Sequence, residues 1–261
     1  MLRKDKYRMS EYKFNAKKTT EELVNYIKGW FEVNGKECNA VVGISGGKDS
    51  SVVAALLVKA LGRDRVVGVM MPDGIQLDID DSRALINYLG IRSETMNIGE
   101  ATRSILREVM CTKYALSEQT KVNMPARMRV VALYAVSQSC NGRVIGTANL
   151  SESYIGWNTR WDLSNCNDLN PIAGLTVTEV KAVGRKLGLP DRFIEKVPSD
   201  GLCGSTDEEK LGFKYFVLDN YIRTGICEDV EAKQKIDERH KRNLFKLSFA
   251  NVFDPGYLVM I

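Results

Sequence analysis

The chain has 261 residues, which is enough to bury a large core in one α/β domain with an added helical part. Hydrophobic residues make up 44% and charged residues 27%, a composition typical of a globular protein and not of a disordered one. The apolar runs, such as the one at 52–58, are too short to span a bilayer, and the N-terminus lacks the apolar segment of a secretory signal. We therefore expect a cytoplasmic protein with no membrane partner.

The positive charge is concentrated at the N-terminus. The whole chain has a formal net charge of +4, and residues 1–18 alone carry seven Lys/Arg and two Asp/Glu. A nucleic-acid-binding protein usually spreads its positive charge over a folded face, so the balance predicts no nucleic-acid partner. We interpret residues 1–18 as a basic leader and residues 19–261 as a single domain. The six cysteines form no C-x-x-C pair, and we expect them to be reduced and buried.

The first two thirds of the chain alternate between expected strands and helices. A helix is predicted to begin at Thr19, with Thr19 as cap, and to end at Asn34-Gly35. The following elements are expected in turn: a strand at 40–44, a helix closed by Leu61-Gly62, a strand at 66–71, a helix at 79–89, a strand at 94–98, a helix at 101–110, a helix at 125–139 and a strand at 143–147.

This alternation is typical of βαβ units, which build a parallel sheet covered on both faces. After a polar loop at 158–170, only short helices are expected, at 176–187, 191–196, 207–211, 215–221 and 228–243. The predicted fold class is α/β, a three-layer, doubly wound, mostly parallel sheet with helices on both faces and a helical C-terminal part.

The segment VVGISGGKDSS at 41–51 carries the clearest chemical signal. A buried strand enters a glycine-rich turn that opens a helix, so free backbone amides and the positive end of the helix dipole face the same point. This arrangement binds phosphates. Ser45 and Ser50 add hydroxyls and Lys48 a positive charge, whereas Asp49 would repel phosphates unless it holds a Mg²⁺ ion that also contacts them.

Two common phosphate motifs do not fit this loop. A Walker A loop needs glycine at position 42, where this chain has Val42, and a Rossmann loop needs glycine at position 45, where it has Ser45. The pattern SGGxDS resembles the pyrophosphate loop of the N-type ATP pyrophosphatases, a group that adenylates an oxygen atom of the substrate. A glycine-rich turn without a ligand is the competing interpretation.

Six further segments resemble the NAD synthetase family within that group, and the resemblance covers the chain from about residue 20. They read MPDGIQLDIDDS at 71–82, NMPARMRVVALY at 123–134, GTANLSESYIGWNTR at 146–160, LTVTEV at 175–180, PSDGLCGSTDEEKLGF at 198–213 and HKRNLF at 240–245. The resemblance implies a ligase that adenylates the nicotinate carboxylate of deamido-NAD with ATP, releases pyrophosphate and forms NAD⁺ and AMP with ammonia. It also implies a homodimer.

The resemblance assigns roles to individual positions. Asp49 and Glu152 would be the catalytic carboxylates that hold Mg²⁺, and Glu152 follows a predicted strand end, where open α/β sheets bind ligands. ATP would contact Gly43, Ile44, Ser45, Gly46, Gly47, Lys48, Asp49, Ser50, Thr147 and Ser199. Deamido-NAD would contact Arg127, Arg160, Asp168, His240 and Lys241. Guanidinium groups suit polyphosphates, whereas His240 taken alone reads as a solvated helix residue.

The segment 161–168 departs from the family pattern. It lacks a Gly-Asp pair and has one extra residue, so Asp162 is a candidate substitute for the missing acid. Val177 stands where many members have an ATP-contacting lysine, and either Lys48 or Lys181 could supply that charge.

Two other functions stay open: a catalytically weakened, nucleotide-binding paralogue, and another adenylating enzyme such as a tRNA-thiolating protein. The charge balance and the lack of paired cysteines disfavour the tRNA-thiolating protein. Only 44 residues precede Ser45, too few for a glutaminase domain, so free ammonia is the expected nitrogen donor.

Overall fold

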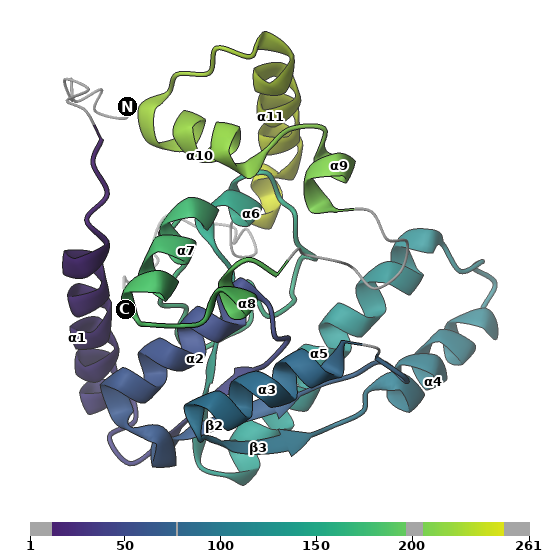
Figure 1. The fold of residues 1–261 in the computed structure, drawn as a ribbon. Helices are drawn as coiled ribbons and strands as arrows, with labels where there is room; N and C mark the ends of the chain where they lie inside the picture. The colour runs from purple at the N-terminus through teal and green to yellow at the C-terminus, as the bar shows by residue number, and fades with distance from the viewer. Residues whose placement is uncertain (1–11, 77, 197–205, 248–261) are drawn as a thin grey trace, which may run out of the picture.

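The computed structural model describes residues 12–76, 78–196 and 206–247. Its centre is a sheet of four parallel strands, β1 (Asn39–Gly43), β2 (Val66–Met70), β3 (Arg92–Thr95) and β4 (Gly142–Ile145), in the order β3-β2-β1-β4 (Figure 1). Every paired strand runs parallel, as the βαβ alternation predicts.

The strand order reverses at β1. Helices α2 (Lys48–Leu61) and α3 (Ile79–Leu89) connect β1 to β2 and β2 to β3. The chain then passes through α4 (Gly99–Met110) and α5 (Glu118–Ser139) and returns to place β4 on the other side of β1. A doubly wound sheet binds its ligands at the carboxyl ends of the strands where the order reverses. The turns that follow β1 and β4 therefore form the expected site.

Apolar cores cover both faces of the sheet, so the predicted three-layer α/β fold is confirmed. Ala40 and Val42 face one core, which is closed by α1 (Ala16–Asn34), α2, α3, α7 (Val177–Lys186) and α8 (Asp191–Ile194). Val41 faces the other, where it packs with Leu133 of α5. The alternation along β1 follows from the two-residue period of a strand.

The C-terminal helices form a third cluster beside the sheet. It involves α6 (Leu150–Tyr154), α9 (Asp207–Leu211), α10 (Tyr215–Thr224) and α11 (Val230–Asn243), followed by a 3₁₀ turn at Leu244–Lys246; a second 3₁₀ turn, Arg63–Arg65, precedes β2. Helix α7 lies between this part and α2 (Figure 1). It joins this part to the sheet, because Val180 and Val183 pack into the first core while Val177 packs with Leu218 and Ile236.

Several predicted boundaries are wrong. Helix α1 begins at Ala16 because Asn15, not Thr19, accepts the capping hydrogen bond, so residues 16–18 of the predicted leader are helical. Helix α5 begins at Glu118 because Ser117 caps it, and Pro125 lies inside the helix. Strand β3 spans 92–95 instead of the predicted 94–98, and it is an exposed edge strand. Helix α6 was not expected.

Two other expectations concern the whole chain. No helix in the described ranges is long and apolar enough to cross a membrane. The five cysteines that the structure describes are free, as expected. Only Cys38 among them is buried, while Cys140, Cys166 and Cys227 are half-buried and Cys111 is exposed, so the expectation that the cysteines are buried is wrong for these four.

Candidate active site

The turn after β1 opens helix α2 and turns its amide groups and hydroxyls toward one another. The Ser50 hydroxyl lies 3.1 Å from the Ser45 hydroxyl, and the Ser45 amide donates to Ser50 Oγ at 3.3 Å. The Gly47 amide donates to Ser45 Oγ at 3.3 Å. The amides and hydroxyls of the turn thus form hydrogen bonds with one another. The same amides and hydroxyls are the groups that an incoming phosphate would contact.

Glycine is required at position 46 by both conformation and space. Gly46 has φ +73, in the left-handed region, and a Cβ there would lie 2.7 Å from Asp81 Cβ and 2.9 Å from the backbone of Asp81. Gly47 differs, because its φ is −85 and a Cβ would meet only Ser45 Oγ, at 3.4 Å. Gly47 also lines the adjoining cavity.

Asp49 and Glu152 come from different elements and lie beside each other. Asp49 is in the first turn of α2 after β1, and Glu152 is in α6, after β4. The buried side chain of Asn149 joins them: its Nδ2 donates to Asp49 Oδ1 at 3.0 Å, and its Oδ1 accepts from the Glu152 amide at 3.0 Å. Residues 100 positions apart are thereby held in one cluster.

Lys48 links the same two acids from the start of α2. Its Nζ lies 2.8 Å from Asp49 Oδ2 and 3.3 Å from Glu152 Oε1, and the residue is 5% exposed. Burial lowers the pKa of the Lys48 ammonium, but the charges of Asp49 and Glu152 outweigh burial and raise it. Burial raises the pKa of the Glu152 carboxyl, and Asp49 adds to this rise while Lys48 and Asn149 oppose it.

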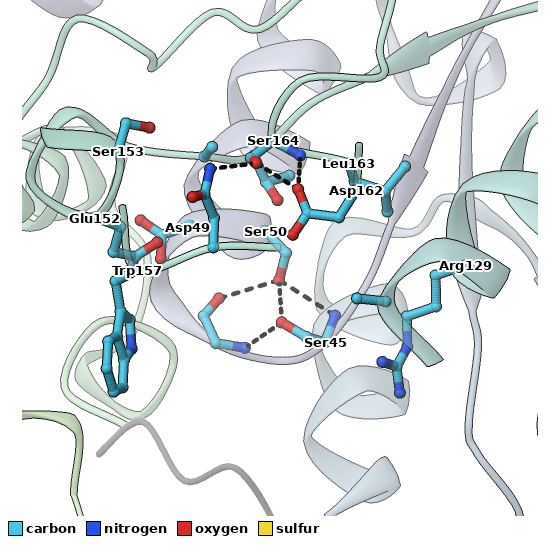
Figure 2. Close-up of a pocket in the computed structure, with 15 residues that line it drawn as sticks. Ser45, Asp49, Ser50, Arg129, Glu152, Ser153, Trp157, Asp162, Leu163 and Ser164 are labelled. Atoms are coloured by element: carbon cyan, nitrogen blue, oxygen red, sulfur yellow. Dashed lines mark hydrogen bonds between the residues drawn. The ribbon is translucent and has the colours of Figure 1, made fainter. Parts of the chain in front are cut away.

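A cavity of about 270 Å³ opens beside this cluster. Figure 2 shows Asp49 and Glu152 on one side of Ser45 and Ser50, with Arg129 on the other. The wall combines the turn after β1, the turn after β4, α5 and the loop after α6. The lining residues are Ser45, Gly47, Asp49, Ser50, Ala126, Arg129, Thr147, Ala148, Glu152, Ser153, Trp157, Asn158, Asp162, Leu163 and Ser164.

The donor set fits magnesium. Three carboxylates line the cavity, and two of them, Asp49 and Glu152, are joined by Asn149 and Lys48. The described residues contain no cluster of three or more His, Cys, Asp or Glu side chains that could hold a metal by themselves. Mg²⁺ is typically bound by one or two carboxylates together with substrate phosphates and water. A pair of acids beside a phosphate-binding turn matches that pattern.

The structure brings most of the predicted ATP-binding residues together. Ser45, Gly47, Asp49, Ser50 and Thr147 line the cavity. Gly43 and Ile44 lead from β1 into the turn, and the Ile44 amide donates to Val69 O at 2.9 Å. Ser199 lies outside the described residues.

None of the predicted deamido-NAD residues is among the described residues that line the cavity. Arg127 Nε donates to Arg160 O at 3.3 Å. The Arg160 guanidinium lies 4.9 Å from the Trp161 ring centre and 5.2 Å from that of Phe245, and its Nε has no hydrogen-bond partner among the described residues. Lys241 is exposed at the end of α11.

His240 is not the solvated helix residue that its sequence context indicates. It is half-buried, and its ring stacks on that of Tyr154 with centres 3.9 Å apart. Its Nδ1 lies 2.7 Å from Tyr154 O, and because a carbonyl oxygen only accepts, Nδ1 is the donor. Its predicted substrate role stays a prediction.

Asp168 and Asp162 both have backbone partners. The Asp168 carboxylate accepts from the Val144 amide at 2.7 Å and from the Tyr134 hydroxyl at 3.1 Å, which joins the segment after the loop to β4. Asp162 accepts from the Thr159 amide at 3.0 Å and from the Ser164 amide at 2.8 Å. Asp162 lines the cavity and Asp168 does not. Asp162 is therefore better placed than Asp168 to contact a ligand in the cavity.

Three residues that shape the site were missed in the sequence. Asn149 is not among the predicted site residues, because the sequence predicts no helix at 150–154. An asparagine three residues before Glu152 is nevertheless a capping signal. Arg129 lines the cavity, two positions after the chosen Arg127, and burial lowers the pKa of its guanidinium. Tyr215, buried near the two acids, came from a helix that carried no chemical signal.

Comparison with known proteins assigns the chain to a family. A profile of the NAD synthase family matches residues 19–254. The chain belongs to the NAD synthetase family. It is 37% identical to the NH(3)-dependent NAD(+) synthetase of Pyrococcus furiosus, over 80% of this chain and 79% of that one. It is 36% identical to the enzyme of the same name from Methanocaldococcus jannaschii, over 90% and 91% of the two chains.

Solved structures of two bacterial proteins share the fold of this NAD synthetase family member. The NMN synthetase of Francisella tularensis superposes with a TM-score of 0.82 at 30% identity, covering 94% of this chain and all of that one. The NH3-dependent NAD synthetase of Campylobacter jejuni gives 0.74 at 25% identity, covering 93% and 100%. Membership of the family disfavours the tRNA-thiolating alternative.

Proposed function

We propose that the protein is an ammonia-dependent NAD⁺ synthetase, a ligase that forms a carbon–nitrogen bond. It adenylates the nicotinate carboxylate of deamido-NAD with ATP, releases pyrophosphate, and amidates the activated carbonyl with ammonia to give NAD⁺ and AMP. The observation that carries the proposal is the pair Asp49–Glu152, held beside a phosphate-binding turn at the switch point of the sheet in a chain of this family.

The chain's own residues would act by binding and orientation. The amides of the turn at 45–47 and the hydroxyls of Ser45 and Ser50 would bind phosphate oxygens, with Gly47 allowing close approach. Asp49 and Glu152 would hold Mg²⁺, which when bound neutralises charge on the triphosphate and on the leaving pyrophosphate. Arg129 would face developing negative charge from the opposite side of the cavity.

The proposals on localisation, nitrogen donor and oligomeric state rest on membership of the family. We propose a cytoplasmic enzyme that uses free ammonia and acts on small molecules as a homodimer. In support of a dimer, α4, α5 and the segment between them carry exposed apolar side chains, namely Ile105, Met110, Tyr114, Val122 and Val131.

A mononucleotide substrate is the second candidate. The Francisella tularensis NMN synthetase superposes with a higher TM-score than the Campylobacter jejuni NAD synthetase, 0.82 against 0.74. The same chemistry would then amidate nicotinate mononucleotide, which lacks the adenylyl half. The dinucleotide remains the first candidate, because the curated relatives at 35–39% identity are NAD synthetases.

One assay tests these activities. The protein is incubated with ATP, Mg²⁺, ammonia and either deamido-NAD or nicotinate mononucleotide. The proposal predicts amidated dinucleotide, AMP and pyrophosphate in equal amounts. ADP as product would contradict adenylation, preference for the mononucleotide would favour the second candidate, and nucleotide binding without turnover would favour a weakened paralogue.

Matched variants test the two acids. Asp49→Asn and Glu152→Gln should each lower kcat at least about a hundredfold, because each removes a charge that acts on the transition state. Glu195→Gln removes a carboxylate from a surface ion pair with Lys181, and it should leave kcat close to that of the unmodified protein. Near-normal turnover of either site variant at saturating Mg²⁺ would contradict these roles.

A further inference from the structure

The position of Lys48 in its helix is electrostatically unfavourable. It is the first residue of α2, where the helix dipole disfavours a positive charge. It is also 5% exposed, and a buried ammonium needs close charged partners. The contacts with Asp49 at 2.8 Å and Glu152 at 3.3 Å provide those partners. Lys48 therefore belongs to the acid pair and not to the framework of the helix.

The lysine lies outside the wall of the cavity. Asp49 and Glu152 both line the cavity, but Lys48 is not among the described residues that do. The ring of Tyr215 lies on another side of the ammonium, with its centre 5.8 Å from Nζ. Asp49 Oδ1 is held by Asn149 while Oδ2 is held by Lys48, so the carboxylate is fixed from two directions.

We propose that Lys48 is the resident counter-ion of the two acids: it holds them together before any metal arrives and lowers their affinity for free Mg²⁺. This inference rests on the proposed metal role of Asp49 and Glu152. When both carboxyls are ionised, the ammonium leaves the cluster with a net charge of −1 in place of −2, so the cluster attracts a divalent cation less strongly. Mg²⁺ then binds efficiently only when the phosphates of ATP add their own ligands.

The role differs from direct phosphate binding by Lys48. Lys48 acts through the two acids, which makes it a positioning residue. It follows that Mg²⁺ and the ammonium can replace each other as the charge that holds the carboxylates together. Removing the ammonium should therefore lower the stability of the metal-free protein and raise its affinity for Mg²⁺.

Metal binding without nucleotide is the decisive experiment. Mg²⁺ is titrated by calorimetry into the full chain and into Lys48→Met, and the thermal midpoint Tm is measured with and without the ion. Lys48→Met should have a lower Tm than the unmodified protein without Mg²⁺, a larger rise in Tm on adding the ion, and at least about tenfold tighter Mg²⁺ binding. Lys48→Gln, which keeps a donor without the charge, should bind Mg²⁺ like Lys48→Met.

Two controls locate the effect. Lys36→Met removes a lysine from an exposed pair with Glu32 and should bind Mg²⁺ like the unmodified protein. The double variant Lys48→Met with Glu152→Gln should lose the gain, because one of the two carboxylates is gone.

The outcomes separate this inference from the proposed metal site. If the unmodified protein binds Mg²⁺ with ATP but Lys48→Met shows no tighter binding of Mg²⁺ alone, the counter-ion role is wrong while the metal site stands. If no variant binds Mg²⁺ with or without ATP, both are wrong. A Lys48→Met chain that folds only when Mg²⁺ is present supports the inference, since the ion then replaces the ammonium.

Discussion

Asn149 contacts both acids through the two ends of one amide. Its NH₂ group donates to Asp49 and its carbonyl oxygen caps α6 at the Glu152 amide. Because the side chain is fully buried, neither bond competes with water. Asn149 and Lys48 therefore each contact both Asp49 and Glu152.

Two substitutions at Asn149 separate its contacts. Asn149→Asp keeps an oxygen to cap α6 but places a carboxylate against Asp49, so we expect kcat to fall about tenfold or more with a small change in Tm. Asn149→Ala loses both bonds and should also lower the free energy of unfolding by about 1–2 kcal/mol. Steady-state kinetics and thermal melts measure the two effects. Full activity of Asn149→Asp would show that the amide does not position Asp49.

The adjacent glycines 46 and 47 should respond differently to alanine. Gly46→Ala forces a methyl into Asp81 at a positive φ and should destabilise the protein by about 1–3 kcal/mol. The methyl of Gly47→Ala would contact only Ser45 Oγ, so the stability of the fold should change little. The methyl would line the cavity, so the variant should bind ATP more weakly. Chemical denaturation and nucleotide titration measure the two outcomes. Equal stability losses at both positions would contradict this assignment.

At the scale of the elements, Glu179 of α7 ties three segments together. It accepts from Arg223 of α10 at 2.8 and 2.5 Å, from the Thr176 amide at 2.8 Å, and from the hydroxyl of Tyr12, which precedes α1. Burial alone raises the pKa of the Glu179 carboxyl, but these hydrogen bonds outweigh burial and leave the pKa below its usual value.

This shift predicts a loss of stability in acid. A carboxyl whose folded pKa is below the unfolded value, about 4.3, contributes stability above that value and loses it as pH falls toward the folded pKa. Glu179→Gln should lower the free energy of unfolding by about 1–3 kcal/mol near pH 7. The difference from the unmodified protein should shrink below about pH 4. A Tm difference that stays constant from pH 7 to pH 3 would contradict the role of the charge.

The sequence predicted the elements that bury a face and missed those fixed by local caps or by tertiary contacts. The apolar runs of β1 and β2 and the two-sided core of α2 are clear because burial dictates their residues. Helix α6 has only five residues and one cap, and the edge strand β3 has no buried residue, so neither has a strong periodic pattern. The seven residues of α5 before Pro125 depend on the cap at Ser117.

At the scale of the whole molecule, the order of the strands places the site. The glycine turn was identified from the sequence because its signal lies within a few residues. By contrast, the contacts of Asp49 with Asn149 and of Lys48 with Glu152 and Tyr215 depend on β4 returning beside β1 and on α10 packing near α6. No local pattern encodes those contacts, which is why the sequence gives the chemistry of the acids and not their partners.

Exposed apolar side chains on α4 and α5 predict self-association of the chain. Val131 of α5 is 60% exposed and Met110 of α4 66%, and covering apolar side chains such as these would favour self-association. If the proposed homodimer uses this surface, light scattering should give twice the chain mass, and Val131→Glu should shift the protein toward the monomer because a buried carboxylate opposes association. Val33→Glu is the matched control, since Val33 is 83% exposed on α1, on the other side of the sheet from α5. A Val131→Glu chain that stays dimeric at low concentration would exclude this surface, and a monomeric unmodified protein would exclude the dimer.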